Sequence, residues 1–512
     1  MTNLWIYRCI LWLWLLTTIA HGQNTVSKKI YYGGYDNMSQ FLRLYNDTFY
    51  IPTMVANGPE PATFSTSLLK LDIAGNILSQ SKFGKMGASV FPEVSYLKSK
   101  SNKFFVPSTV SHGNDVLSTV IIFDKDGDTL AIKSFGDTAH YNYMNWILEK
   151  KGHPETLLMF GSTDSLCSRS HNGTCRTNIR IIDTTGNLVS TRIFNGGNQK
   201  NVVNADTTDE GGYIFSGFEM QNSSGGTGQV YVMKLDSSLN SIWMKYYFFP
   251  GARNPNIRTL KSGNYILGYA SLDSIFQSFA YFSRLAIAKL DTDGNVIWNK
   301  KYATLERGCA ISAVKELVNG DLIACGILDI STGNSAYPKQ LAGVLLRTDS
   351  NGNQKWIESY RITNPSDLNG QNYLCDVIEM PDGGFAAIGY VVTTDTSANL
   401  TWFLRVDSLG CVTQGCNPYS ANGSERRNLY VAYPNPCTNK IFIENTTAIY
   451  EGVYSIELFD LKSNDIVQEA KTPWRTGIFE LDLSKIPAGI YGTRIRVRGQ
   501  QDCLLKIIRI SD

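Results

Sequence analysis

The chain has 512 residues, of which 43% are hydrophobic and 18% are charged, as is typical of folded globular domains. Its 47 lysines and arginines nearly balance its 45 aspartates and glutamates, and no long run carries a single sign of charge. Nucleic acid or an anionic membrane surface would require a basic patch, so the composition argues against both as partners.

The first 22 residues have the pattern of a secretory signal peptide. Arg8 precedes an apolar run from Cys9 to Ile19, and Ala20-His21-Gly22 places small residues at the two positions that a signal peptidase reads. We therefore expect an exported chain whose mature form begins at Gln23. No later run reaches the roughly 18 uninterrupted apolar residues of a membrane span, so we expect no membrane span in the mature chain.

One hairpin pattern recurs along most of the remaining sequence. Its best copy, Lys289 to Tyr302, has an alternating apolar run, a turn of Asp, Gly and Asn residues, and a second alternating run that ends in aromatics. Turn residues that tolerate positive φ between runs of period two predict a β-hairpin. A glycine follows the first turn aspartate by three positions in every copy except the fourth, which has Leu239. The turn aspartates, which we expect to have a structural role, are Asp72, Asp124, Asp183, Asp236, Asp291, Asp349 and Asp407.

These aspartates are spaced by 52 to 59 residues, which is in the range of propeller blades. A second hairpin-like segment precedes the hairpin in each repeat, and helical periodicity is nearly absent. Four strands in each of seven repeats predict an all-β fold with a seven-bladed β-propeller over residues 23–416. The last repeat lacks an outer strand after Gly410, and we expect the segment at about 27–33 to complete the last blade.

The repeats, over residues 27–416, resemble the Asp/Gly/Trp repeats of secreted bacterial propellers and, more loosely, those of quinoproteins. In Asp291, Gly294 and Trp298 the glycine and tryptophan follow the aspartate by three and seven positions, one fewer than in the quinoprotein pattern. This departure argues against a quinone, and we expect no cofactor.

Nine cysteines remain once Cys9 leaves with the signal peptide. An oxidising compartment would preserve disulfides, and short loops close easily. The disulfide candidates are Cys167 with Cys175, Cys411 with Cys416, and Cys437 with Cys503. The odd set that remains, of which we expect one to be a free thiol, is Cys309, Cys325 and Cys375. Spacings typical of zinc sites are absent, and we expect no metal.

The C-terminal part of the chain differs from the repeats. Residues 417–428 are polar and turn-rich, as in a linker, and residues 429–512 predict a small β-sandwich of short alternating strands. Four motifs in order are Tyr433-Pro434-Asn435-Pro436, Tyr454 to Asp460, Leu481 to Tyr491 with Gly489, and Lys506 to Arg509. They resemble the C-terminal sorting domain of the type IX secretion system. The resemblance implies that the secretion machinery is a partner and that the chain passes through the periplasm to the extracellular space or the outer cell surface.

Long insertions, which we expect on one face of the propeller, separate the second and third strands of five repeats, at 162–176, 218–229, 271–283, 329–340 and 392–399. Binding residues tend to lie on such loops. The candidate ligand-binding residues there are Tyr141, Tyr143, Trp146, Phe276, Phe279, Tyr281 and Tyr337. Their rings could stack on sugars or on partner side chains, or could pack the loops on one another.

Catalytic signatures are missing from the sequence. There is no nucleophile motif and no His-Glu-x-x-His, and no pair of carboxylates stands out, so we name no catalytic residue. We expect a binding module for a glycan or a protein ligand rather than an enzyme. Two alternatives remain open: a carbohydrate-active enzyme with acidic residues in the propeller funnel, and a structural component of the surface or matrix.

Overall fold

The computed structural model divides the chain into two compact units, Met1–Ser424 and Glu425–Asp512. The described residues run from 26 to 510, and all of their regular elements are strands. The segments that lie outside the described residues, besides the two chain ends, are 31–36, 57–63, 84–88, 93–96, 99–101, 113–114, 137–140, 165–175, 195–198, 221–228, 248–252, 277–279, 308, 331–339, 364–369, 393–398, 413–429, 434–436, 446–451, 461–464, 475–477 and 498–502.

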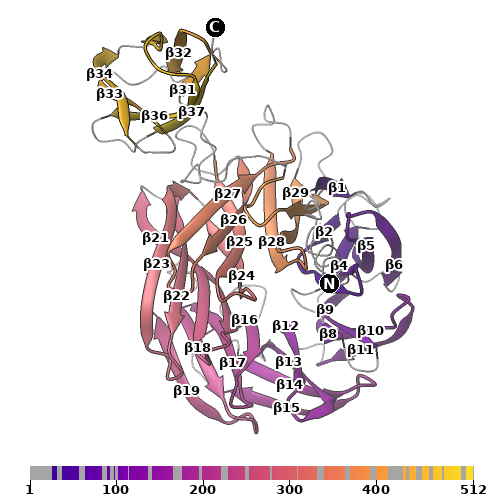
Figure 1. The fold of residues 1–512 in the computed structure, drawn as a ribbon. Coiled ribbons are helices and arrows are strands. Elements are labelled where there is room, and N and C mark those ends of the chain that lie inside the picture. The colour runs from indigo at the N-terminus through magenta and orange to yellow at the C-terminus, as the bar shows by residue number, and fades with distance from the viewer. Residues whose placement is uncertain are drawn as a thin grey trace, which may run out of the picture. The chain divides into compact units, whose positions relative to one another are not determined.

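The strands of the first unit form consecutive antiparallel sheets of four, in which each sheet begins near a central space and ends at the periphery (Figure 1). In the first two sheets the inner strand is broken into two short pieces. The first three sheets contain β2 (Asn37–Ser39), β3 (Arg43–Tyr45), β4 (Thr48–Ala56), β5 (Phe64–Asp72) and β6 (Ile77–Phe83); β7 (Ser89–Pro92), β8 (Leu97–Lys98), β9 (Phe104–His112), β10 (Asp115–Phe123) and β11 (Thr129–Phe135); and β12 (Tyr141–Lys150), β13 (His153–Asp164), β14 (Arg176–Asp183) and β15 (Leu188–Phe194).

The later sheets of this unit follow the same order from centre to periphery. They contain β16 (Gln199–Thr207), β17 (Tyr213–Met220), β18 (Gln229–Leu235) and β19 (Ser241–Tyr247); β20 (Arg253–Thr259), β21 (Tyr265–Phe276), β22 (Ala280–Leu290) and β23 (Val296–Arg307); β24 (Ala310–Glu316), β25 (Leu322–Asp329), β26 (Leu341–Thr348) and β27 (Gln354–Tyr360); and β28 (Gln371–Glu379), β29 (Phe385–Val392) and β30 (Asn399–Val406).

The last two sheets are joined into one eight-stranded sheet by a single parallel pair, Leu341 with Gln371. The strand β1 (Val26–Ile30) pairs antiparallel with β30, with Val26 opposite Arg405. Dividing the eight-stranded sheet at its parallel pair therefore leaves four strands for each aspartate repeat among the described residues. The predicted all-β class and propeller fold are confirmed, and the number of seven blades in the ring stays a prediction.

The repeated turn owes its shape to its aspartate. In the first copy, Asp72 Oδ1 accepts the backbone N–H groups of Ala74 at 2.9 Å and Asn76 at 2.7 Å. Gly75 has a φ of +77°, a conformation that glycine adopts without strain. In the fourth copy Leu239 has a φ of +66° and is only 3% exposed, so burial of its side chain offsets the backbone strain.

Tyrosine hydroxyl groups join neighbouring sheets by hydrogen bonds at these turns. Tyr302 Oη donates to the carbonyl oxygen of Gly352 at 2.8 Å, and Tyr247 and Tyr360 make the same bond to Gly294 and Gly410 of the next sheet. A side-chain carbon added to Gly352 would lie 2.7 Å from Trp298. The same close approach recurs at successive sheets, and it leaves no space for a side chain at this turn position. The repeated glycine therefore serves packing between blades as well as chain reversal.

The second unit contains two sheets that share one core. The strands are β31 (Tyr430–Tyr433), β32 (Lys440–Asn445) and β35 (Ile478–Asp482) in one sheet, and β34 (Ile466–Trp474), β33 (Gly452–Asp460), β36 (Gly489–Val497) and β37 (Cys503–Arg509) in the other. Ile441 and Leu481 of the first sheet pack in one buried cluster with Leu458, Tyr491 and Ile507 of the second. The core between the two sheets is that of a small β-sandwich.

The predicted disulfide between Cys437 and Cys503 is wrong, because Cys437 is a buried thiol. Cys437 forms a β-bridge with Arg509, six residues beyond Cys503 on β37. Six residues of strand span about 20 Å, whereas a disulfide requires Cα atoms within about 7 Å.

The other cysteines divide into two groups. Cys411 is disulfide-bonded, and its predicted partner Cys416 lies outside the described residues, as do Cys167 and Cys175. The remaining set, in which we expected a single free thiol, is present entirely as thiols: Cys309, Cys325 and Cys375. Cys309 precedes β24 directly, while Cys325 pairs with Ala313 three residues into that strand, so the two thiols are about 13 Å apart along the sheet.

Candidate functional site

The inner strands of the later sheets share a β-bulge. One extra residue interrupts the pairing of β12, β16, β20, β24 and β28 with the second strand of each sheet. A bulge bends the strand and redirects side chains. The residues at or within these bulges are Asn145, Val203, Asn254, Ser312 and Cys375.

Two cavities lie along the inner strands. The larger, of about 610 Å³, is lined by the strand ends that lead into the tight turns and by Asp209 and Lys261 of those turns. The smaller, of about 310 Å³, is lined by four of the bulge residues, Val203, Asn254, Ser312 and Cys375. Phe41, Trp146 and Arg258 line both cavities, so these three side chains form the boundary between them.

Asp376 on β28 connects the first sheet to the last two. Its side chain is 1% exposed, and its Oδ1 accepts the N–H of Val377 at 2.9 Å and lies 2.5 Å from Lys315 Nζ. Its Oδ2 accepts the N–H of Leu42 at 3.3 Å and lies 3.7 Å from Arg43 Nη1. Each carboxylate oxygen thus has one backbone donor and one cation, which keeps a buried charge compensated.

Arg258 on β20 projects between the cavities. Its Nη1 donates to the carbonyl oxygen of Ala205 at 3.2 Å. Among the described residues no acceptor pairs with its Nε or Nη2, and the half-buried side chain lines both cavities. The neighbouring Asp206 is occupied, because its two oxygens accept the N–H groups of Thr207 at 2.9 Å and Thr259 at 3.0 Å. Two nitrogens of Arg258 are therefore available to a ligand.

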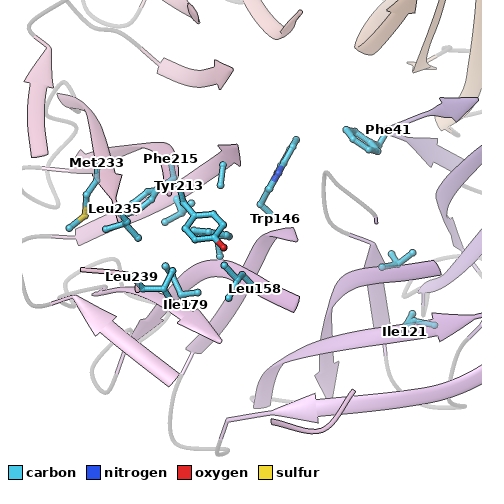
Figure 2. Close-up of a cluster of buried hydrophobic side chains, with 14 of the residues drawn as sticks. Phe41, Ile121, Trp146, Leu158, Ile179, Tyr213, Phe215, Met233, Leu235 and Leu239 are labelled. Atoms are coloured by element: carbon cyan, nitrogen blue, oxygen red, sulfur yellow. The ribbon is translucent and has the colours of Figure 1, made fainter. Parts of the chain in front are cut away.

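Two aromatic rings support the two arginines. The guanidinium carbon of Arg43 is 4.0 Å from the centre of the Phe41 ring, and that of Arg258 is 4.5 Å from the centre of the Trp146 ring. The rings meet edge to face with centroids 5.7 Å apart, and Figure 2 shows them pointing toward each other from separate elements. Cation–π contacts of this kind hold a guanidinium in place.

Positive charge is in excess at the centre of this site. Three cations, Arg43, Arg258 and Lys315, share the two carboxylates of Asp206 and Asp376. Burial lowers the pKa of Lys315 to about 8; Asp376 opposes the shift, and the repulsion of Arg43 and Arg258 adds to it. Burial likewise lowers the pKa of Arg258, with Arg43 again adding to the effect. An additional negative charge would relieve this repulsion.

The C-terminal unit matches a family of known role. Residues 431–509 match the family model described as "Secretion system C-terminal sorting domain". These residues are a type IX sorting domain. The sorting domain marks the chain for export to the cell surface or the extracellular space, which confirms the predicted localisation, and it implies interaction with the type IX secretion machinery. In the described part of the chain, no helix has the length and hydrophobicity needed to cross a membrane.

The sequence matches no curated protein. Three similar solved structures are an α-L-arabinanase of Penicillium chrysogenum complexed with arabinobiose, a protein of unknown function from Dyadobacter fermentans, and the polysaccharide lyase Uly1. Their identities are 12%, 11% and 7%, and their TM-scores 0.39, 0.40 and 0.41. They cover 62%, 64% and 76% of this chain and 93%, 100% and 93% of their own. Similarity at this level carries no argument about a ligand.

The sorting motif is described in part. Tyr433 ends β31 and Gly489 begins β36, while Pro434, Asn435 and Pro436 lie outside the described residues. Tyr491 is 3% exposed, and its hydroxyl donates to the carbonyl oxygen of Pro487 at 2.7 Å. Packing inside the sorting domain accounts for this tyrosine.

Of the seven aromatic ligand-binding candidates, only Trp146 has a described side chain. It is 4% exposed and packs against Arg258 and Phe41, so it supports the cavity wall rather than presenting a flat stacking surface. Tyr141 and Tyr143 lie near the start of β12, Phe276 ends β21, and Tyr281 lies near the start of β22; their side chains are outside the described part of the structure. Phe279 and Tyr337 lie wholly outside it.

The charged residues at the centre were missed in the sequence. Asp206, Arg258 and Lys315 each lie two residues before the residue that opens a tight turn, Thr208, Leu260 and Leu317. Aligning the inner strands on these turns would have placed three charged residues at one repeat position. Arg43 lies at the same position, two residues before Tyr45, which opens the turn at Asn46 and Asp47, whereas Asp376 lies four residues before the turn residue Met380. In the described residues, no three His, Cys, Asp or Glu side chains are grouped to hold a metal ion.

Proposed function

We propose that this exported propeller is a binding module that takes a glycan ligand into the larger axial cavity. A volume of about 610 Å³ is in the usual range for small-molecule sites. The observation that carries the proposal is the pair of arginines, Arg43 and Arg258, which both line the cavity while the neighbouring carboxylates of Asp206 and Asp376 accept protein donors. Such a wall can hydrogen-bond a ligand without further rearrangement.

The geometry of Asp206 and Asp376 disfavours these two carboxylates as the acid and base of a carbohydrate-active enzyme. Glycoside hydrolysis uses one carboxylic acid to protonate the leaving group and a second carboxylate as base or nucleophile. Asp206 accepts two backbone N–H groups, and Asp376 accepts two more and contacts two cations. Both groups are held as acceptors by these donors, so neither is placed to deliver a proton.

A glycan array probed with the secreted full-length protein tests this proposal, with product formation assayed on every hit. Ile378 lines the larger cavity, and Ile378→Trp should fill part of it and weaken binding by about tenfold or more. The matched control is Ile297→Trp on the outer strand β23, where the side chain is 51% exposed.

The expected result is binding by the wild type and the control, loss of binding by Ile378→Trp, and no product. Equal binding by Ile378→Trp and Ile297→Trp would place the site elsewhere. Product formation from a bound glycan would refute the proposal of a binding module and favour the enzyme.

A further inference from the structure

The two arginines of the axial cavity have the features of an oxyanion site. Arginine presents parallel N–H donors that match the oxygens of a carboxylate or sulfate, and a guanidinium stacked on an aromatic ring keeps its plane while its edge donates. Arg43 and Arg258 are stacked in this way on Phe41 and Trp146. Arg43 keeps 32% of its side chain exposed, and both arginines line the larger cavity.

The charges around these donors leave room for one more anion. Lys315 Nζ lies 2.5 Å from Asp376 Oδ1. Asp206, the carboxylate that interacts electrostatically with Arg258 across two strands, accepts two backbone N–H groups rather than forming a salt bridge. The rim adds Lys261 and Asp209, which are exposed, so solvent screens their charges. It also adds Glu316, which is half-buried and accepts the backbone N–H of Lys261 through its Oε2. The deep part of the cavity thus attracts negative charge.

The remaining wall suits hydroxyl groups. Asp206, Thr207 and Thr259 line the larger cavity beside Arg258, and their oxygens have lone pairs that can accept O–H groups from a ligand. A sugar carries several hydroxyl donors around one acidic group, whereas the ionised side chains of an acidic peptide are acceptors only.

We infer that the axial cavity recognises an acidic saccharide, whose carboxylate or sulfate is held between the guanidinium groups of Arg43 and Arg258. This inference rests on the proposed function and names its ligand class. The carboxylate and the sulfate share the chemistry of a multi-oxygen anion, and the titrations below distinguish them.

The test is a set of calorimetric titrations of the full-length protein with methyl galactoside, methyl galacturonide, galactose 6-sulfate and a tetraglutamate peptide. We expect one or both acidic sugars to bind about tenfold or more tightly than the neutral sugar. Arg258→Gln and Arg43→Gln should each remove most of this preference. The matched control is Arg192→Gln on the outer strand β15, where the guanidinium is exposed and bonds Asn240, and it should leave the preference intact.

Arg258→Lys separates charge from geometry. A lysine keeps the positive charge but lacks the paired donors, so we expect it to restore only part of the affinity that Arg258→Gln loses. Thermal unfolding of each variant shows whether it is folded. Arg43→Gln provides the test if Arg258→Gln is unfolded, because Arg43 is the more exposed of the two.

Each result decides the inference. Equal binding of neutral and acidic sugars, or a preference that survives both glutamine variants, would overturn it while leaving the proposed function in place, provided that Ile378→Trp still abolishes binding. Binding of tetraglutamate alone would overturn the saccharide class. Failure of every sugar here and on the array would overturn both the inference and the proposed function.

Discussion

Lys315 gives the sharpest test of the charge arrangement at the propeller axis. We expect the propeller of the wild type to gain stability on going from pH 7 to pH 10 relative to a Lys315→Met variant. The lysine is buried among Asp376, Arg43 and Arg258, with Asp206 on the same cavity wall. Burial lowers its pKa from the usual 10.5 to about 8 in the folded chain.

The sign and size follow from proton linkage. Below pH 8 the lysine is charged in the folded and unfolded states, and the full cost of burying the charge is present. Between about pH 8 and 10.5 the folded state has released the proton while the unfolded state still binds it, so the free energy of unfolding rises with pH. With one pKa unit worth about 1.36 kcal/mol, the expected gain by pH 10 is about 2.5 kcal/mol.

Urea unfolding followed by tryptophan fluorescence measures this difference. Five of the six tryptophans after residue 22 belong to the propeller unit and one to the sorting domain, so the signal reports mainly on the propeller. Other groups that titrate between pH 7 and 10 are common to both proteins and cancel in the comparison. A wild type and a Lys315→Met variant with parallel pH profiles would refute the lowered pKa, and so would a relative loss of stability by the wild type.

Three further predictions concern the tyrosine hydrogen bond between sheets, the irregular turn and the ligand. Tyr302→Phe removes the hydrogen bond to the Gly352 carbonyl and should lower the free energy of urea unfolding by about 1 kcal/mol. An unchanged midpoint would show that this bond does not stabilise the packing of the two sheets. Leu239→Gly relieves a positive φ worth about 1 kcal/mol but empties a buried site, so a net loss of about 2 kcal/mol is expected in the same assay, whereas a gain would show that backbone strain dominates. Calorimetric affinity for an acidic sugar should fall as Lys315 loses its charge between pH 7 and pH 10, and it should be nearly flat over this range in Lys315→Met; equal falls in both proteins would argue against a role for the lysine.

The strands were predictable because the information that forms them is local. An aspartate such as Asp291 accepts the backbone N–H groups of residues two and four positions later, so a short motif reports a hairpin wherever it occurs. The sorting domain was recognised for a related reason, since its motifs are contiguous. Cys437 and Cys503 show the limit: nearness to the two ends of a segment says nothing about register, and the register of β37 keeps them apart.

No contiguous motif marks the axial site. Arg43, Arg258, Lys315 and Asp376 come from four inner strands separated by long stretches of sequence, and they meet only because each strand reaches the axis. The bulge before each of the last three residues changes which side chains face the axis, and an alternating pattern read along one strand cannot anticipate that change. The sequence favoured the long loops as the place of a binding site. The larger cavity is lined by the ends of the inner strands that lead into the tight turns.

The pairing of β1 with β30 determines when the last sheet of the propeller can be completed. The two strands are separated by more than 360 residues, so the segment made first finds its partner only after almost the whole propeller has been synthesised, and closing so long a loop costs about 5 kcal/mol of chain entropy. Until β30 (Asn399–Val406) has been synthesised, β1 therefore has no strand to pair with and the last sheet of the propeller stays incomplete. Both strands precede Glu425, so proteolytic removal of the sorting domain after export would leave the seam of the ring intact.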